Sequence, residues 1–520
     1  MPVASAIEAT AATKPPSLKD RLARLYPGLI VAVLATAAAI LRFHALGQKS
    51  VWIDEGVSIE MARLDWYNFL RILWRHEANM ALYTLLLRFW LLLGNSEPWI
   101  RALSVLSAVA TIPATYLLGR KLFDARVGIM ASFLIVINPF HIRYSQEARS
   151  YSLFAFLAVL SSLYFLKVLE DPSDTNRRGY VWTSVLAVYT HFFAGLLVVA
   201  QWLSFRLLDR KDVEPVMKKS WRQFAIAITP LLIFVATTGL GVLRWIPRPD
   251  RMALYITAMF FTGGGEKLLW LYAAACAVAL IPVIPAFVRF RKMRWEDWRY
   301  AFVAIWLLLP FAIVFIVSQW KSCFLARYFI FTVPAMALLA AAGLVRLRWR
   351  ALMGGALLLF AALSLPGIDL GYQKDIDIVR EDFRPATRYI LAHAEPGDVI
   401  LFHQPIGRMP YEYYRSRMTA PAYPVVIYPA HGEGLTFKEF YAGRPPETLL
   451  AAVPSRYRRI WIVFTHNELP GGPDPTTSLI SALYGKNYPV LERQTFQEIE
   501  LRLYCRDCNK DASPQAGNRN

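Results

Sequence analysis

The chain has 520 residues, of which 56% are hydrophobic and only 18% charged, and its formal net charge is +19. This share of apolar residues exceeds what a soluble core needs, so the composition indicates an integral membrane protein. Membrane topology and attraction to anionic lipid explain the positive charge, so we expect no nucleic-acid partner.

Long apolar segments recur along the chain. About eleven of them have, or nearly have, the length that a helix needs to cross hydrocarbon. They are 27–43, 101–118, 127–142, 150–166, 180–191, 193–208, 223–243, 268–288, 301–319, 328–345 and 351–367. No small-residue cleavage site follows the first segment, so we expect it to be an uncleaved span and not a signal peptide.

Lysines and arginines gather at every second connection, for example at 120–126, 206–222 and 289–294. Basic residues in short loops stay on the cytoplasmic side of a membrane. These clusters lie inside, together with the N-terminal segment 1–26, only if the apolar stretch 81–93 lies in the outer interface without crossing. The sequence therefore predicts a multi-pass protein of the bacterial inner membrane, with a cytoplasmic N-terminus and a periplasmic C-terminal domain.

On this topology, polar residues collect on the outer face. The first outer loop, about 47–100, contains the acidic pair Asp54 and Glu55 soon after the first span. Further polar groups of outer loops are Tyr144, Glu147, Arg149, Arg244, Lys321 and Arg327. Arginine groups match phosphate oxygens, and a carboxylate can remove a proton from an incoming hydroxyl or amine. This combination fits transfer of a sugar from a lipid phosphate, because the phosphate leaves readily once its charge is held.

Three motifs of the outer face resemble the polytopic GT-C glycosyltransferases. They are Trp52-Ile53-Asp54-Glu55, Tyr144-Ser145-Gln146-Glu147-Ala148-Arg149 and Ala326-Arg327-Tyr328. The chain most closely resembles the branch with protein O-mannosyltransferases, lipid A aminoarabinose transferases and rhizobial galacturonosyltransferases. The resemblance implies a GT-C-like catalytic domain over 27–369. It also implies a polyprenyl-phosphate sugar as donor, and inverting transfer of one hexose or pentose to a lipid, glycan or protein acceptor.

The resemblance also implies roles for single residues. Asp54 is expected to be the catalytic base. From the acidic pair we also expect Glu55, beside it, to be catalytic. Arg101 and Arg327 are expected to contact the donor phosphate or to organise the site, and Glu147 to position the acceptor or the first loop. The other expected phosphate contacts are Tyr328, Lys321 and Arg244, and the other expected site-organising residues are Tyr144, Arg149 and His76.

One motif departs from the family. Many relatives have His-Pro-Pro-Leu where this chain has His76-Glu77-Ala78-Asn79-Met80, so the backbone and the acceptor specificity are expected to differ there. A divalent metal on Asp54, Glu55 and Glu147 is possible. Because basic groups can neutralise the phosphate without a metal, we predict no obligatory metal or other cofactor.

The polar residues also have simpler interpretations. Asp54 and Glu55 would favour the N-terminus of a helix that begins near Gly56. Glu147 and Arg149 could form an interfacial ion pair, and Arg327 could extend toward lipid headgroups. His191, at the edge of a span, is expected to be structural.

Residues 370–508 are predicted to form a separate extracytoplasmic α/β domain with a partly parallel sheet. Strands are expected at 398–403, 424–428 and 459–464, and helices at 383–394, 436–442 and 476–485. Cys505 and Cys508 are expected to form a local disulfide or to remain free thiols, ahead of a disordered tail at 509–520. We expect this domain to cover the active face or to help to select the acceptor.

Two other functions fit a polytopic basic protein. A lipid-linked sugar transporter or flippase would place ionisable groups near the middle of the membrane and would show repeated halves. A polyprenyl-linked glycan ligase or polymerase would use the same donor face with another acceptor. The Asp54-Glu55 pair favours a transferase of single sugars.

Overall fold

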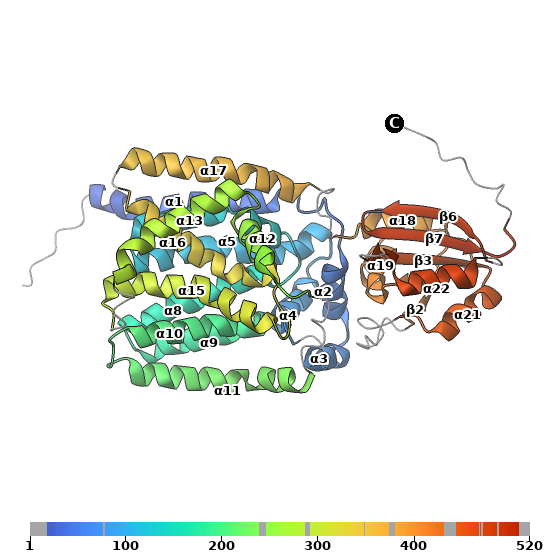
Figure 1. The fold of residues 1–520 in the computed structure, drawn as a ribbon, viewed down its shortest axis with the longest axis horizontal. Helices are drawn as coiled ribbons and strands as arrows, with labels where there is room; N and C mark the ends of the chain where they lie inside the picture. Colours follow the sequence, from blue (N-terminus) through green and yellow to red (C-terminus); the bar gives the residue numbers. More distant parts are fainter. Residues whose placement is uncertain are drawn as a thin grey trace, which may run out of the picture.

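The computed structural model describes residues 18–75, 78–238, 246–285, 292–347, 349–373, 380–430, 444–466, 468–469, 472–485 and 488–508. It consists of a helical body followed by a smaller α/β module near the C-terminus (Figure 1). Figure 1 shows the long helices of the body side by side, with the short helices α2 and α3 at the end that faces the module. The predicted fold class, a helical membrane domain with a C-terminal α/β domain, is confirmed.

Eight helices in the described part of the chain are long and apolar enough to cross a membrane. They are α1 (Leu18–Phe43), α5 (Glu97–Leu122), α8 (Tyr151–Glu170), α11 (Glu214–Thr238), α13 (Glu266–Leu280) with η2 (Ile281–Val283), α15 (Trp295–Ser318), η3 (Ala326–Thr332) with α16 (Val333–Val345), and α17 (Arg350–Tyr372). A ninth span is possible because α6 (Ala125–Val136) and α7 (Pro139–Ser145) together form a segment that is bent by 62°. The helices α9 (Asp174–Thr190) and α10 (Ala194–Leu207) fall short of the same criterion, so about eleven spans remains a prediction.

The break between α6 and α7 has a local cause. The side chain of Asn138 accepts a hydrogen bond from the backbone N–H of His141, and Pro139 occupies the first position of α7. Arg42 of α1 also donates to the carbonyl oxygens of Ile135 and Val136, which lie in the last turn of α6. The bend thus ends one helix and starts another directly before the second outer loop.

The first outer loop folds into three short helices, α2 (Ile53–Arg63), α3 (Trp66–Arg75) and α4 (Ala81–Trp90). A helix of the 10 residues of α4 rises about 15 Å, which is half of the hydrocarbon thickness. This length agrees with the prediction that the apolar stretch 81–93 does not cross the membrane. Another short helix, α12 (Arg251–Thr262), lies ahead of α13.

The C-terminal module contains a five-stranded sheet in the order β2-β1-β3-β7-β6. Its strands are β1 (Val399–His403), β2 (Val425–Tyr428), β3 (Arg459–Thr465), β6 (Val490–Phe496) and β7 (Ile499–Cys505). Strand β1 is parallel to β2 and β3, and β7 is antiparallel to β3 and β6. The three predicted strands are confirmed, and the antiparallel pair β6 and β7 was not predicted.

Helices and short elements complete the module. They are α18 (Phe383–His393), η4 (Pro405–Gly407), α19 (Arg408–Arg415), α21 (Glu447–Arg456), α22 (Pro475–Tyr484), and the small strands β4 (Glu468–Leu469) and β5 (Gly472–Pro473). The predicted helices at 383–394 and 476–485 are confirmed, and the one at 436–442 lies outside the described residues.

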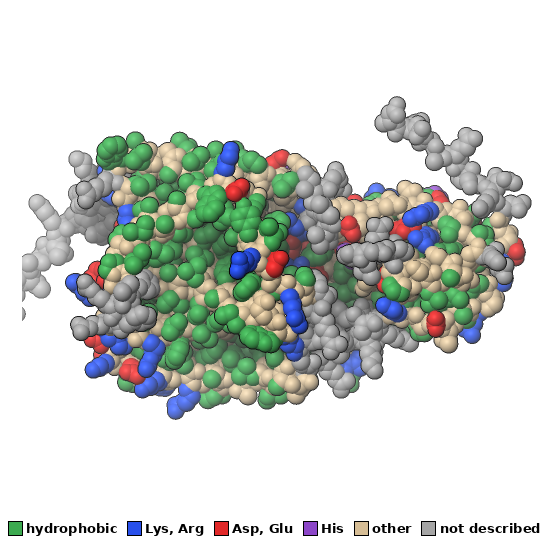
Figure 2. Space-filling view, viewed as in Figure 1, with side chains coloured by type: hydrophobic (Ala, Val, Ile, Leu, Met, Phe, Trp, Pro, Cys, Tyr) green, Lys and Arg blue, Asp and Glu red, His purple; other side chains and the backbone are tan. Residues whose placement is uncertain are grey.

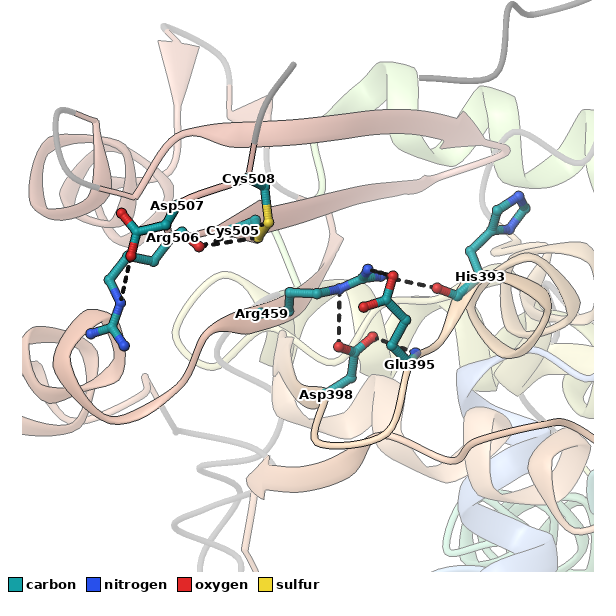
Figure 3. Close-up of a disulfide and its surroundings, with 8 residues drawn as sticks. All are labelled: His393, Glu395, Asp398, Arg459, Cys505, Arg506, Asp507 and Cys508. Carbon is teal, nitrogen blue, oxygen red and sulfur yellow. Dashed lines mark hydrogen bonds and ion pairs between the residues drawn. A yellow bond between two sulfur atoms is a disulfide. The ribbon is translucent and has the colours of Figure 1, made fainter. Parts of the chain in front are cut away.

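Figure 3 shows a cluster of ion pairs at the start of β3 and a disulfide that follows β7. Arg459, at the start of β3, pairs with Glu395 and with the buried Asp398, whose other oxygen accepts a hydrogen bond from Trp461 at 3.0 Å. Cys505 and Cys508 form a disulfide, so the first of the two predicted states is the one observed.

The surface of the helical body fits a lipid environment. Figure 2 shows apolar side chains across this body, and lysine and arginine side chains at its end away from the module. Exposed large apolar residues include Leu92, Leu358 and Leu365, each more than 60% exposed. A water-soluble protein rarely exposes such a continuous apolar surface. The chain is therefore a multi-pass membrane protein.

Candidate active site

Asp54 is the second residue of α2 and lies at the end of the helical body that faces the module. Its side chain is 25% exposed. Oδ2 lies 3.4 Å from Nη2 of Arg327 and 3.9 Å from Nη2 of Arg149, but it has no hydrogen-bond partner within the described chain. Oδ2 is itself buried, so nearby positive charge holds the carboxylate in place while the rest of the Asp54 side chain stays partly exposed.

The two arginines beside Asp54 differ in what else they bind. Arg149 donates from Nη1 to the backbone oxygen of Asp54 and to Oγ of Ser58, both at 3.0 Å, so it ties the second outer loop to α2. Arg327, at the start of η3, lies 5.8 Å from the ring centre of Trp52, and its Nε has no hydrogen-bond partner in the described structure. Nε is buried, but the Arg327 side chain is 18% exposed, so the guanidinium keeps donor capacity for an anionic ligand. Its phosphate contact stays a prediction.

Glu55 is fully buried, and its environment differs from that of Asp54. Arg101 donates to its two oxygens at 2.8 and 2.6 Å, and the N–H of Ala148 donates to Oε1 at 2.8 Å. Burial by itself raises the pKa of the Glu55 carboxyl, but the adjacent guanidinium outweighs burial and lowers this pKa below its usual value. The prediction of a catalytic Glu55 is wrong for this geometry, because a fully paired and buried carboxylate cannot reach a substrate.

Arg101 likewise organises the site without facing it. Its remaining N–H groups donate to the backbone oxygens of Leu46, Lys49 and Ser50 at 2.8 to 2.9 Å. With only 2% of its surface exposed, Arg101 has no donor left for a phosphate. Two roles were expected for this residue. The structure supports the organising role, and in this geometry Arg101 does not contact a phosphate.

Glu147 in the second outer loop is also buried, and Arg380 from the start of the C-terminal module forms an ion pair with it. Burial raises the pKa of the Glu147 carboxyl, although the charges of Arg380, Arg143 and Arg327 act in the opposite direction. The guanidinium of Arg380 also lies 5.2 Å from the ring centre of Trp52. Arg380 was not predicted to be a site residue, because residues 370–508 were assigned to a separate domain.

Positive charge exceeds negative charge around this cluster. The guanidinium groups that act on Asp54 or Glu147 are those of Arg143, Arg149, Arg327 and Arg380. Glu55 adds no free negative charge because Arg101 neutralises it. Since this surplus lies in a mostly buried setting, it favours an anionic ligand such as a phosphate.

Aromatic rings border the charged groups. Tyr144 contacts Tyr151 at 5.3 Å between ring centres, and His191 contacts Tyr328 at 4.9 Å. The hydroxyl of Tyr151 is buried and has no hydrogen-bond partner in the described part of the chain. The predicted site residues Tyr144 and Tyr328 thus belong to an aromatic wall. Tyr151 was not predicted as part of it, and His191, expected to be structural, packs within it.

Three other predicted residues lie elsewhere. Arg244 and His76 are outside the described residues. Lys321 is exposed just past α15, and no side-chain contact joins it to the Asp54 cluster within the described chain. Its predicted phosphate contact is therefore not part of the observed geometry.

The three carboxylates considered as metal ligands lie next to arginine side chains. Asp54, Glu55 and Glu147 each face a guanidinium group. Within the described ranges there is no group of three histidine, cysteine, aspartate or glutamate side chains that could hold a metal ion. Positive charge at this site comes from arginine side chains.

Comparisons with known proteins bear on the fold of the chain. The profile of the family described as Dolichyl-phosphate-mannose-protein mannosyltransferase matches residues 78–239. No curated protein sequence matches the chain. The crystal structure of ArnT from Cupriavidus metallidurans in the apo state is 15% identical, with a TM-score of 0.58 over 92% of this chain and 98% of that one.

Two further structures are similar. ArnT from Cupriavidus metallidurans bound to undecaprenyl phosphate has 15% identity and a TM-score of 0.55 over 92% of this chain and 98% of that one. The oligosaccharyltransferase AglB from Archaeoglobus fulgidus, in complex with an inhibitory peptide and a dolichol-phosphate, has 12% identity and a TM-score of 0.49 over 85% and 70%. The family profile thus matches a part of the helical body, and the chain has the fold of ArnT over nearly its whole length.

Proposed function

We propose that this protein is an inverting glycosyltransferase. It moves one monosaccharide from a polyprenyl-phosphate carrier to a lipid, glycan or protein acceptor on the periplasmic face of the bacterial inner membrane. The observation that carries the proposal is the pairing of Asp54 with Arg327. An acidic oxygen without a hydrogen-bond partner lies 3.4 Å from a guanidinium with remaining donor capacity, at one end of a membrane-spanning body.

The two groups divide the chemistry. The carboxylate of Asp54 removes the proton from the acceptor hydroxyl or amine as the oxygen or nitrogen of that group attacks the anomeric carbon. The bond from this carbon to the phosphate oxygen breaks on the opposite face of the sugar, and the electron pair leaves with the phosphate. Arg327 stabilises the negative charge that grows on the phosphate, with Arg143 and Arg380 contributing at longer range. The sugar ends with inverted configuration and the proton on Asp54.

Arginine supplies the positive charge that other phosphate-transfer sites take from a metal, so the proposal includes no obligatory cofactor. Turnover by protein treated with a chelator, and then assayed in a metal-free buffer, is expected to equal that of untreated protein. Loss of turnover that returns on adding a divalent cation would contradict this part of the proposal.

The main test is release of polyprenyl phosphate by purified protein in nanodiscs, given a panel of undecaprenyl-phosphate sugars and a membrane lipid extract as acceptor. Asp54→Asn keeps the size of the side chain but removes the base, so turnover is expected to fall about 100- to 10,000-fold. Binding of undecaprenyl phosphate should persist, because the arginines remain.

The matched control is Asp65→Asn in the same outer loop. Asp65 is exposed and only caps a turn at Asn68, so turnover should not change. If Asp54→Asn turned over the donor as fast as wild type, Asp54 would be a helix-capping residue and the proposed mechanism would be wrong. Movement of an intact lipid-linked sugar across the bilayer, without release of polyprenyl phosphate, would instead show a transporter.

A further inference from the structure

The backbone around Asp54 obtains hydrogen bonds from the C-terminal module. Trp52 is the N-cap residue of α2, but its side chain makes no capping hydrogen bond. The N–H of Ile53 donates instead to Oε2 of Glu381 at 3.3 Å, and the N–H of Val51 donates to the hydroxyl of Tyr414 at 2.7 Å. The first N–H groups of a helix have no hydrogen-bond acceptors within the helix. Acceptors from elsewhere in the protein therefore decide whether the first turn is ordered.

The module also fixes the side chains next to Asp54. Arg380 pairs with Glu147 of the second outer loop and lies over the ring of Trp52, which is only 7% exposed. Arg327 lies over the same ring at 5.8 Å. Trp52 is therefore enclosed by one guanidinium from the helical body and one from the module, two residues before Asp54.

Further contacts hold the start of the module against the first outer loop. Arg384 pairs with Glu97 and donates to the backbone oxygen of Lys49 at 3.0 Å. Asp382 accepts a hydrogen bond from the hydroxyl of Ser50. These contacts dock the module, but they do not reach the first turn of α2.

We propose that Glu381 and Arg380 are positioning residues of the active site. Glu381 caps the helix that bears Asp54, and Arg380 holds Trp52 and Glu147 around it, so the C-terminal module is part of the catalytic centre and more than a cover. This inference rests on the proposed function of Asp54 as base. A shift of about 1 Å in a reacting group can lower a rate about 100-fold, so loss of either contact should act on the chemical step.

The test compares Glu381→Ala, Glu381→Gln, Arg380→Ala and Arg384→Ala in the full-length protein. Glu381→Ala removes the cap and should lower kcat about 10- to 100-fold with KM for the donor changed less than about 3-fold. Glu381→Gln keeps an oxygen that can accept from Ile53 and should restore most of kcat. Arg380→Ala should lower kcat to a similar extent.

Arg384→Ala is the matched control, because it loses an ion pair across the same interface away from α2. It should leave kcat within about 3-fold of wild type, since no contact to the first turn of α2 is lost. Equal loss of kcat in Arg384→Ala and Glu381→Ala would show that docking of the module matters only as a whole, and it would overturn the positioning role. Normal kcat in both Glu381→Ala and Arg380→Ala would overturn it as well.

Hydrogen exchange separates this inference from the proposed function. Amide exchange of the peptide at 50–56 should speed up in Glu381→Ala and stay slow in Glu381→Gln and Arg384→Ala, whether or not any donor is turned over. Absence of turnover in wild type with this exchange pattern would reject the glycosyltransferase and keep the capping contact. Unchanged exchange in Glu381→Ala would reject the capping contact itself.

Discussion

The ion pairs at the two ends of the helical body differ in how deeply they are buried. At the end that faces the module, Arg101 pairs with Glu55 and Arg380 pairs with Glu147, and these side chains are between 1% and 8% exposed. At the other end of α5, Lys121 pairs with Glu170 through side chains that are 25% and 44% exposed.

This difference distinguishes two uses of an ion pair. Taking two charges out of water costs free energy that the pair regains only with good geometry and further hydrogen bonds. Such pairs persist where they fix a backbone, as Arg101 does through three carbonyl oxygens. Exposed pairs contribute little to stability, and a positive charge at the end of a span acts mainly on topology. Substitutions at the two ends should therefore differ in both stability and activity.

The largest effect is expected from Arg101→Met. This change leaves Glu55 buried without its partner, and breaking a buried pair in this way costs about 3–5 kcal/mol. We expect a strong fall in thermal stability in detergent and loss of turnover, because the loop that carries Asp54 loses its anchor. The measurements are the melting temperature and polyprenyl phosphate release.

Arg101→Met combined with Glu55→Leu serves as the control, because it removes both charges. It should regain part of the stability but not all of it, since the N–H of Ala148 and the carbonyl oxygens of Leu46 and Ser50 still lack their partners. A single variant as stable as wild type would show that the buried pair does not hold the loop.

The location of the site could be predicted from the sequence, but its pairing could not. The acidic pair follows an apolar segment at a membrane boundary, and this local pattern made Asp54 a candidate. Glu55 is buried and paired while Asp54 is partly exposed. This difference depends on Arg101, which is 46 residues further along the chain, and on the direction in which α2 starts. No local pattern contains this information.

Long-range contacts explain the other differences. Arg380 is 233 residues from Glu147, so neither residue indicates the other. The charged run Arg380-Glu381-Asp382 directly after the last span was the available signal that the module docks on the site. Strand β6 was missed because most of its side chains are exposed or half-buried, so it lacks the apolar run that identified β1 and β3.

Gly56→Ala should have the next largest effect. A Cβ atom at this position of α2 would lie 2.8 Å from the backbone nitrogen of Pro410 in α19, so the helix and the module would have to separate. Alanine normally favours a helix over glycine, but overpacking costs about 1–3 kcal/mol. We expect a lower melting temperature and lower turnover.

Gly354→Ala in α17 is the control, because no atom lies within 4 Å of the added Cβ. It should be neutral or slightly stabilising. If Gly56→Ala also stabilised the protein, the close approach of α2 to α19 would not exist in solution.

A smaller effect on stability is expected when a change of pH alters the protonation of His466. Its Nε2 lies 2.6 Å from Oε1 of Glu381, and its Nδ1 lies 3.7 Å from Glu498. The hydrogen bond with Glu381 raises the pKa of His466 above its usual value, against the opposing effect of burial. A raised pKa stabilises the folded state fully below the pKa of the unfolded chain, and this stabilisation is lost as the pH rises through the folded pKa.

The melting temperature of wild type should therefore fall between pH 6 and pH 9 by more than that of His466→Gln. His393→Gln is the control, because the His393 side chain is exposed in the same module and contacts Tyr389, through the backbone oxygen and the ring, and no acidic side chain in the described structure. Identical pH profiles for wild type and His466→Gln would contradict a contribution of this contact to docking of the module.

The smallest effect is expected from Lys121→Ala at the end away from the module. Exposed ion pairs contribute about 0–1 kcal/mol, and neither Lys121 nor Glu170 bears on the geometry around Asp54. The melting temperature and turnover should match those of wild type, and the small difference in stability should shrink further at high salt. A loss as large as that of Arg101→Met would show that burial does not separate the two classes of ion pair in this protein.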